Sequence, residues 1–143
     1  MITPFEPDTG NLPPGIHQAT WDEVVARYGY TPRRRQLLAG LDVALAALRF
    51  AGCRRAYLDG SFVTSKRDPA DYDACWELRD VDRARVDPIL KTIDPERLAQ
   101  KLKFGGEFFA IDSSAGRGSA RMLSFFQRDK VSGEPKGIIA IDL

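Results

Sequence analysis

The sequence of 143 residues has few of the side chains that build metal–thiolate sites or disulfide frameworks. Only two cysteines, Cys53 and Cys75, and one histidine, His17, are present. The cysteines form no C-x-x-C pair, which argues against a zinc site. Each cysteine belongs to an apolar segment, so we expect buried, reduced thiols. A Ser-His-Asp hydrolase would need His17 to reach its site from a proline-rich leader, which argues against that class.

The sequence also has no long hydrophobic run and almost no net charge. Without 18 consecutive apolar residues, neither a membrane span nor a signal peptide is supported, and with reduced thiols we expect a cytoplasmic protein. The net charge of +1 gives no general attraction to long nucleic acid, although RNA stays among the acceptors considered below. An apolar fraction of 43% and a charged fraction of 29% are ordinary for a globular chain of one domain.

Prolines and glycines are concentrated in residues 1–19, which predicts an irregular arm laid over the surface. Residues 20–143 then form the single domain. Thr20 and Glu23 have capping-box spacing, so a short helix should follow Thr20. Thr31 and Pro32 predict the start of a second, longer helix that runs to about residue 50.

The rest of the chain alternates apolar strand patterns with helical ones, which predicts an α+β fold with helices packed on a small mixed sheet. The expected elements are strands at 55–59, 71–78, 107–112 and 136–143, helices at 81–90, 95–102 and 120–128, and a polar loop at 113–119.

Three consecutive arginines, 33–35, occupy the first turn of the long helix, where positive charge opposes the helix dipole. One interpretation is a patch that binds phosphate. The other, which we prefer, is a solvated face with an acidic neighbour.

The segment 57–76 carries the pattern on which the functional interpretation depends. An apolar strand breaks at Gly60-Ser61, and Asp71 and Asp73 then begin a second strand. Residues i and i+2 of a strand share a face, so the two carboxylates should repel each other, and at least one should be pushed toward its neutral form. Mg²⁺ commonly binds one or two carboxylates together with substrate phosphates. Glycine permits close approach, and backbone N–H groups with the Ser61 hydroxyl can hold phosphate oxygens.

This pattern resembles the nucleotidyltransferase superfamily, which includes the polymerase-β-like and minimal nucleotidyltransferases. Gly60, Ser61, Asp71 and Asp73 match its Gly-Ser, spacer and Asp-x-Asp. The alternative is a tight turn followed by an edge strand with two solvated aspartates. The segments 12–15, 58–62, 125–127 and 136–138 also resemble a bacterial and phage family of nucleotidyltransferase-like proteins.

The resemblance implies a nucleotidyltransferase-like fold and two Mg²⁺ ions bound by Asp71, Asp73 and a third carboxylate from a neighbouring strand. If the strand at 107–112 runs parallel to the strand at 55–59, Asp112 supplies it, which is our choice. If it runs the other way, Glu107 does. Lys66 and Arg67, in the loop after Gly60-Ser61, either neutralise a triphosphate or are simply solvated.

The predicted function is transfer of a nucleoside monophosphate from a nucleoside triphosphate to a hydroxyl of a small molecule, an RNA end or a protein. The chain has little left to form an acceptor domain, so a protein partner or a second copy would supply that site. The alternative is a weakly active or inactive nucleotide-binding regulatory module of a toxin–antitoxin or phage-defence pair. A scaffold protein that merely shares the fold is a third interpretation.

Overall fold

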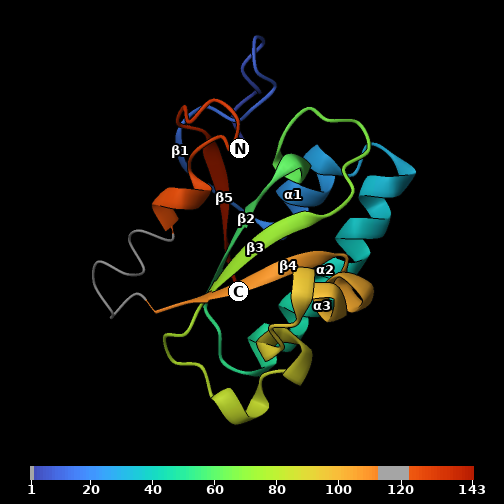
Figure 1. Cartoon of the computed structure of the whole chain (residues 1–143), viewed down its shortest axis with the longest axis vertical. Helices are drawn as coiled ribbons and strands as arrows, with labels where there is room; N and C mark the ends of the chain where they lie inside the picture. Colours follow the sequence, from blue (N-terminus) through green and yellow to red (C-terminus); the bar gives the residue numbers. More distant parts are fainter. Residues whose placement is uncertain (1, 113–122) are drawn as a thin grey trace.

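A computed structural model describes residues 2–112 and 123–143 of the chain. Within these residues, the strands form one mixed five-stranded sheet in the order β1-β5-β2-β3-β4 (Figure 1). The fold is therefore mixed α/β, consistent at this level with the expected α+β class. The elements are β1 (Gly15–Ala19), α1 (Trp21–Tyr28), α2 (Pro32–Phe50), β2 (Arg55–Asp59), β3 (Tyr72–Glu77), α3 (Leu98–Phe104), β4 (Gly106–Ile111) and β5 (Gly137–Asp142).

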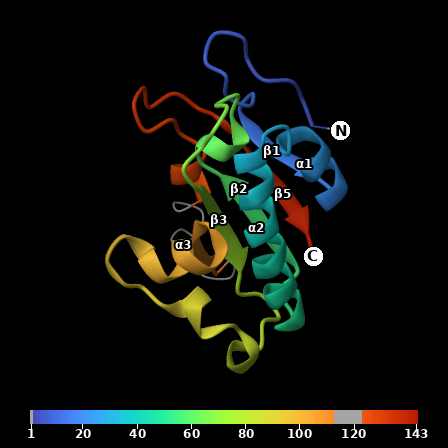
Figure 2. The same cartoon turned by 90° about the vertical axis from the view of Figure 1, so that its right-hand side faces the viewer.

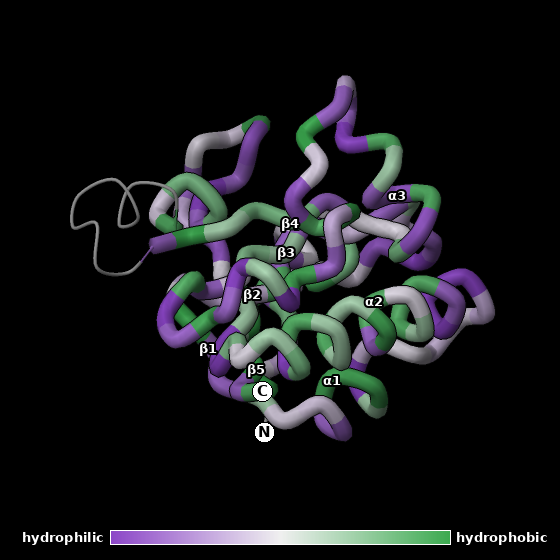
Figure 3. The backbone as a smooth tube through the Cα atoms, turned by 90° about the horizontal axis from the view of Figure 1, so that it is seen from below, coloured by the Kyte–Doolittle hydropathy of each residue, from purple (hydrophilic) through white to green (hydrophobic). Residues whose placement is uncertain are grey.

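The sheet has a different cover on each face. Helices α1, α2 and α3 lie on one side, and α2 lies in front of the central strands in Figure 2. The larger apolar core fills the space between these helices and the sheet. A smaller cluster on the other face contains Tyr57, Cys75, Ile111, Phe126, Ile138 and Ala140. Hydrophobic residues are accordingly prominent along the central strands, and hydrophilic ones in the surrounding connections (Figure 3).

The two N-terminal helices begin where the sequence predicts. Thr20 accepts a hydrogen bond from the Glu23 N–H, and the Glu23 side chain accepts one from the Thr20 N–H, so the capping box is complete. Thr31 caps α2 by accepting a hydrogen bond from the Arg34 N–H through its side chain, with Pro32 in the first turn. Both Cys53 and Cys75 are buried free thiols, as expected.

Strand directions decide which residues meet at the site. β5 lies between β1, to which it is parallel, and β2, to which it is antiparallel. β3 is antiparallel to β2, and β4 is parallel to β3. The central position of β5 explains its uninterrupted apolar sequence, because Ile138, Ile139 and Ala140 are fully buried.

Four expectations need correction or fall wholly or partly outside the described residues. The arm 1–19 is not irregular throughout, because Gly15–Ala19 forms β1 along β5. Segment 81–90 is not an α-helix but contains two 3-10 turns, Arg83–Arg85 and Pro88–Lys91; Pro88 has no N–H to continue a helix. The predicted loop 113–119 lies outside the described residues, and of the helix predicted at 120–128 the structure describes a helical turn at 123–126.

None of the helices that the structure describes combines the length and the apolar character needed to cross a membrane.

Candidate functional site

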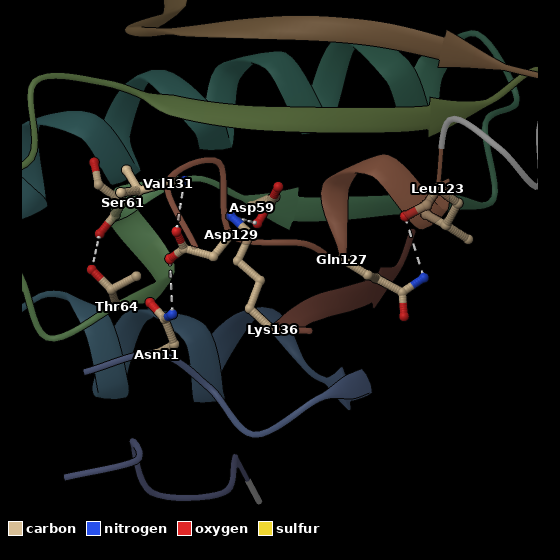
Figure 4. Close-up of polar contacts among 9 residues, drawn as sticks. All are labelled: Asn11, Asp59, Ser61, Thr64, Leu123, Gln127, Asp129, Val131 and Lys136. Atoms are coloured by element: carbon tan, nitrogen blue, oxygen red, sulfur yellow. Dashed lines mark hydrogen bonds and ion pairs between the residues drawn. The ribbon is translucent and has the colours of Figure 1, made fainter. Parts of the chain in front are cut away.

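The turn after β2 brings the Gly-Ser pair against the first residues of β3. Gly60 has φ +86°, a conformation that side chains rarely adopt, and a Cβ there would lie 3.0 Å from Asp73 Oδ2. Ser61 then opens a 3-10 turn, and its carbonyl accepts a hydrogen bond of 2.6 Å from Thr64 Oγ1 (Figure 4). Glycine at position 60 thus allows the Asp73 carboxylate to approach the turn closely.

Cross-strand register aligns three carboxyl side chains beside this turn. Asp59 of β2 is the partner of Asp73 in β3, and Asp73 is the partner of Glu107 in β4. Registered partners project from the same face, and neighbouring strands are only about 4.8 Å apart. Asp71 lies two residues before Asp73 and shares its face. We call these four residues the acid row.

The direction of β4 decides the identity of the third carboxylate. The strand runs antiparallel to β2, because it is parallel to β3, so the parallel arrangement on which the choice of Asp112 depended is wrong. Glu107, the alternative, therefore lies opposite Asp73. Asp112 follows the other end of β4, roughly 16 Å farther along the strand from Glu107.

Burial and like charge make the acid row electrostatically unfavourable when all of its members are ionised. The pKa of Asp73 is raised to about 6, chiefly by burial and to a smaller extent by the carboxylates of Glu107, Asp59 and Asp71, while Lys130 acts in the opposite direction. Burial also raises the pKa of Asp59, against the effects of Lys136 and the Gly60 N–H. The pKa of Asp73 therefore shifts in the expected direction, but the main cause is burial, and the expected repulsion from Asp71 is the smallest contribution.

Two lysines balance part of this negative charge. Lys101 Nζ of α3 lies 3.0 Å from Glu107 Oε1 and 3.8 Å from Asp71 Oδ2. Lys136 Nζ, just before β5, lies 3.0 Å from Asp59 Oδ1 (Figure 4). The Lys136–Asp59 pair is buried. It is an ion pair rather than a well-aligned hydrogen bond, because no donor reaches Asp59 Oδ1 with hydrogen-bond geometry.

The acid row does not converge on a single point. Within residues 2–112 and 123–143, no group of three or more His, Cys, Asp or Glu side chains is arranged to hold a metal ion. The row offers hard oxygen donors of the kind that Mg²⁺ prefers, and its repulsion is only partly relieved by lysine. Side-chain rotation, with displacement of Lys101 from Glu107 and Asp71, would be needed to bring three carboxylates onto one ion.

A buried arginine of α2 binds the backbone of the loop between β2 and β3. Arg34 of α2 donates from its guanidinium to the carbonyls of Phe62 (2.7 Å), Thr64 (2.8 Å) and Lys66. Its guanidinium also lies 5.0 Å from the centroid of the Phe62 ring. Arg34 is completely buried, so it is neither a phosphate patch nor a solvated residue, and it fixes the loop that follows Gly60.

Lys66 and Arg67 are the predicted triphosphate contacts. Hydrogen bonds hold their backbone carbonyls in place but not their charged groups. The Lys66 carbonyl binds Arg34, and the Arg67 carbonyl accepts a hydrogen bond from Thr31 Oγ1 at 3.3 Å. Both residues are exposed. Their side chains remain available on the rim of the turn, and their role stays a prediction.

Sequence reasoning missed Asp59 and Lys136 as members of the site. The available signal was a charged residue at one end of each of two apolar strands. Asp59 follows residues 56–58, and Lys136 precedes residues 137–141. Only the three-dimensional pairing of β2 with β5 reveals that these charges meet. The pair thus places one lysine at the Asp59 end of the acid row, next to the Gly60-Ser61 turn.

The fold and site define a mixed α/β protein with a row of carboxylates beside a Gly-Ser turn at one end of its sheet. The chain belongs to the family described as "Family of unknown function (DUF6932)", whose model matches residues 3–142. No curated protein and no solved structure matches the chain significantly.

Proposed function

We propose that the chain is a Mg²⁺-dependent nucleotidyltransferase that binds a nucleoside triphosphate between the Gly60-Ser61 turn and the acid row. The observation that carries the proposal is the register of Asp59, Asp73 and Glu107 across three adjacent strands beside a glycine with positive φ. This arrangement concentrates negative charge where a divalent cation would stabilise it, and the same cation could bind the phosphates of a substrate.

Each residue of the site has a defined task in this proposal. Asp71, Asp73 and Glu107 would hold Mg²⁺, which would polarise the α-phosphate and activate the acceptor hydroxyl. The backbone N–H groups of Ser61 and Phe62 have no acceptor within the described residues, so they can donate to phosphate oxygens. Lys66 and Arg67 add positive charge at the rim. Asp59 and Lys136 keep the turn in place.

The acceptor remains defined only as a hydroxyl. No separate acceptor domain accompanies the sheet and its helices among the described residues. We therefore retain a protein partner or a second copy of the chain as the source of the acceptor site, with a small molecule, an RNA end or a protein as acceptor.

A second candidate is a nucleotide-binding or regulatory module with weak or no transfer activity, as in one member of a toxin–antitoxin or phage-defence pair. It is favoured by Lys101, whose ammonium group occupies the space between Glu107 and Asp71. It is also favoured by the lack of a convergent three-ligand group in the described part of the chain.

Transfer of label tests the first candidate. The native chain, incubated with Mg²⁺, α-labelled nucleoside triphosphates and mixed RNA, protein and small-molecule acceptors, should form a labelled product. Asp71→Ala combined with Asp73→Ala should lose that product, because two of the three carboxylates proposed to hold the cation are removed. Asp42→Ala, on the exposed side of α2, serves as the control. Equal labelling by the native chain and the double variant would exclude the assigned site.

A further inference from the structure

A separate cavity lies beside β4, away from the acid row. It has a volume of about 370 Å³, and buried Trp76, Leu90 and Phe108 contribute to its lining. Residues 83–97, drawn in yellow and orange in Figure 1, run along this end of the sheet. Trp76 and Phe108 project from the helix-covered face, whereas the acid row projects from the other. The cavity is within the size range of small-molecule sites.

The charged groups around this cavity are all positive. Arg83, Lys91 and Arg97 line it, no Asp or Glu does, and none of the three forms an ion pair within the described residues. Two of the cations are fixed by the backbone. Lys91 Nζ donates to the Arg83 carbonyl at 3.0 Å, and Arg97 Nη1 donates to the Phe108 carbonyl at 3.0 Å.

Arg97 lies in a short left-handed stretch of backbone, and its guanidinium packs on an aromatic ring. Glu96 and Arg97 have φ values of +58° and +49°, which are unfavourable for residues with side chains. The Arg97 guanidinium carbon lies 4.0 Å from the centroid of the Phe109 ring. An apolar cavity thus has a cation held at its edge without a counter-ion.

The outer edge of β4 supplies a further donor. The Leu78 N–H donates to the Ile111 carbonyl, which sets the alternation of the parallel ladder and turns the Ala110 N–H and C=O outward. Phe108, the other outward residue nearby, has its N–H bound to Gln100 Oε1 and its carbonyl to Arg97. Ala110 lines the cavity, and its backbone groups have no partner within the described residues.

We infer that this cavity binds a small amphipathic anion, with its apolar body against the partly exposed side chains of Leu78, Ile93 and Phe109 and its carboxylate or phosphate head near Arg97 and Lys91. Such a ligand removes the apolar lining from water and pairs cations that the protein leaves unpaired. The outward Ala110 N–H can donate to the same head group. The site is independent of the proposed transferase site, because the acids lie on the opposite face.

Decanoate, decyl phosphate and decanol test this inference by calorimetric titration of the full chain. Decanoate or decyl phosphate should bind at one site per chain, and decanol should bind at least about ten-fold more weakly, because it lacks the charge that the cations pair. The tighter of the two anions identifies the head group. In a ¹⁵N-labelled chain, the Ala110 amide resonance should shift with either anion.

Arg97→Gln combined with Lys91→Gln should weaken anion binding by at least about ten-fold while leaving the affinity for decanol unchanged. Arg49→Gln, which removes an exposed positive charge from α2, should change neither. A far-ultraviolet circular dichroism spectrum equal to that of the native chain would establish that the double variant is folded. Equal affinity for decanoate and decanol, unchanged anion affinity in the folded double variant, or no binding of any of the three compounds would overturn the inference.

Discussion

Glu107→Gln should reduce nucleotidyl transfer by roughly 10³-fold, because loss of a metal-binding carboxylate removes several kcal/mol of transition-state stabilisation and each 1.36 kcal/mol is a factor of ten. Asp112→Asn should leave the rate nearly unchanged. The two residues lie at opposite ends of β4, and only Glu107 is in register with Asp73. Single-turnover transfer of labelled nucleotide in Mg²⁺ measures the difference.

Glu107 also pairs with Lys101, so a structural effect of the substitution needs its own control. Lys101→Gln removes the same ion pair and leaves the carboxylate in place. It should retain transfer and bind Mg²⁺ at least as well, since Glu107 and Asp71 no longer share an ammonium group. If Lys101→Gln loses as much activity as Glu107→Gln, the ion pair rather than metal binding explains the result. A large loss in Asp112→Asn alone would contradict the assignment.

Asp73→Asn should make the metal-free protein more stable at pH 8 by up to about 3 kcal/mol, and the gain should vanish near pH 4. The pKa of Asp73 rises from an ordinary value of 3.8 to about 6 on folding, chiefly through burial. A carboxyl whose pKa is raised in the folded state favours folding only while protonated. The native chain therefore loses this stability as the pH rises from about 4 through 6, and asparagine, which carries no charge, does not.

Urea unfolding at pH 4, 6 and 8 in the presence of a chelator measures this effect. Asp42→Asn removes an exposed carboxylate from α2 and controls for the change in net charge. Saturating Mg²⁺ should raise the stability of the native chain at pH 8 by more than it raises that of Asp73→Asn. A variant that is less stable than the native chain at all three pH values would show that Asp73 makes a favourable contact when ionised.

Local signals in the sequence predicted the elements that depend on near neighbours. The capping residues Thr20 and Thr31 located both N-terminal helices, and apolar runs located β2, β3, β4 and β5. The prediction of a helix at 81–90 was wrong because the apolar residues have helical spacing, although Pro88 interrupts the helical hydrogen bonding. The prediction that residues 15–19 are irregular was wrong because it followed from the nearby prolines, whereas these residues form a short edge strand that pairs with β5.

The candidate site was predicted only as far as residues close in sequence could specify it. Asp71, Asp73 and the Gly60-Ser61 turn lie together because they are at the two ends of the connection between the antiparallel strands β2 and β3. The choice between Glu107 and Asp112 depended on the direction of β4, which is set by packing between distant segments. The Asp59–Lys136 pair depended likewise on β2 and β5 becoming neighbours. Long-range topology is the part that local patterns do not encode.

Calorimetric titration of ATP, GTP, CTP and UTP into the native chain, with and without Mg²⁺, tests the central claim most directly. We predict that at least one triphosphate binds only when Mg²⁺ is present. Asp73→Asn should abolish this Mg²⁺-dependent binding, because it removes the central carboxylate of the acid row. Absence of binding by all four triphosphates in Mg²⁺, or binding that is equal with and without the metal, would contradict the account.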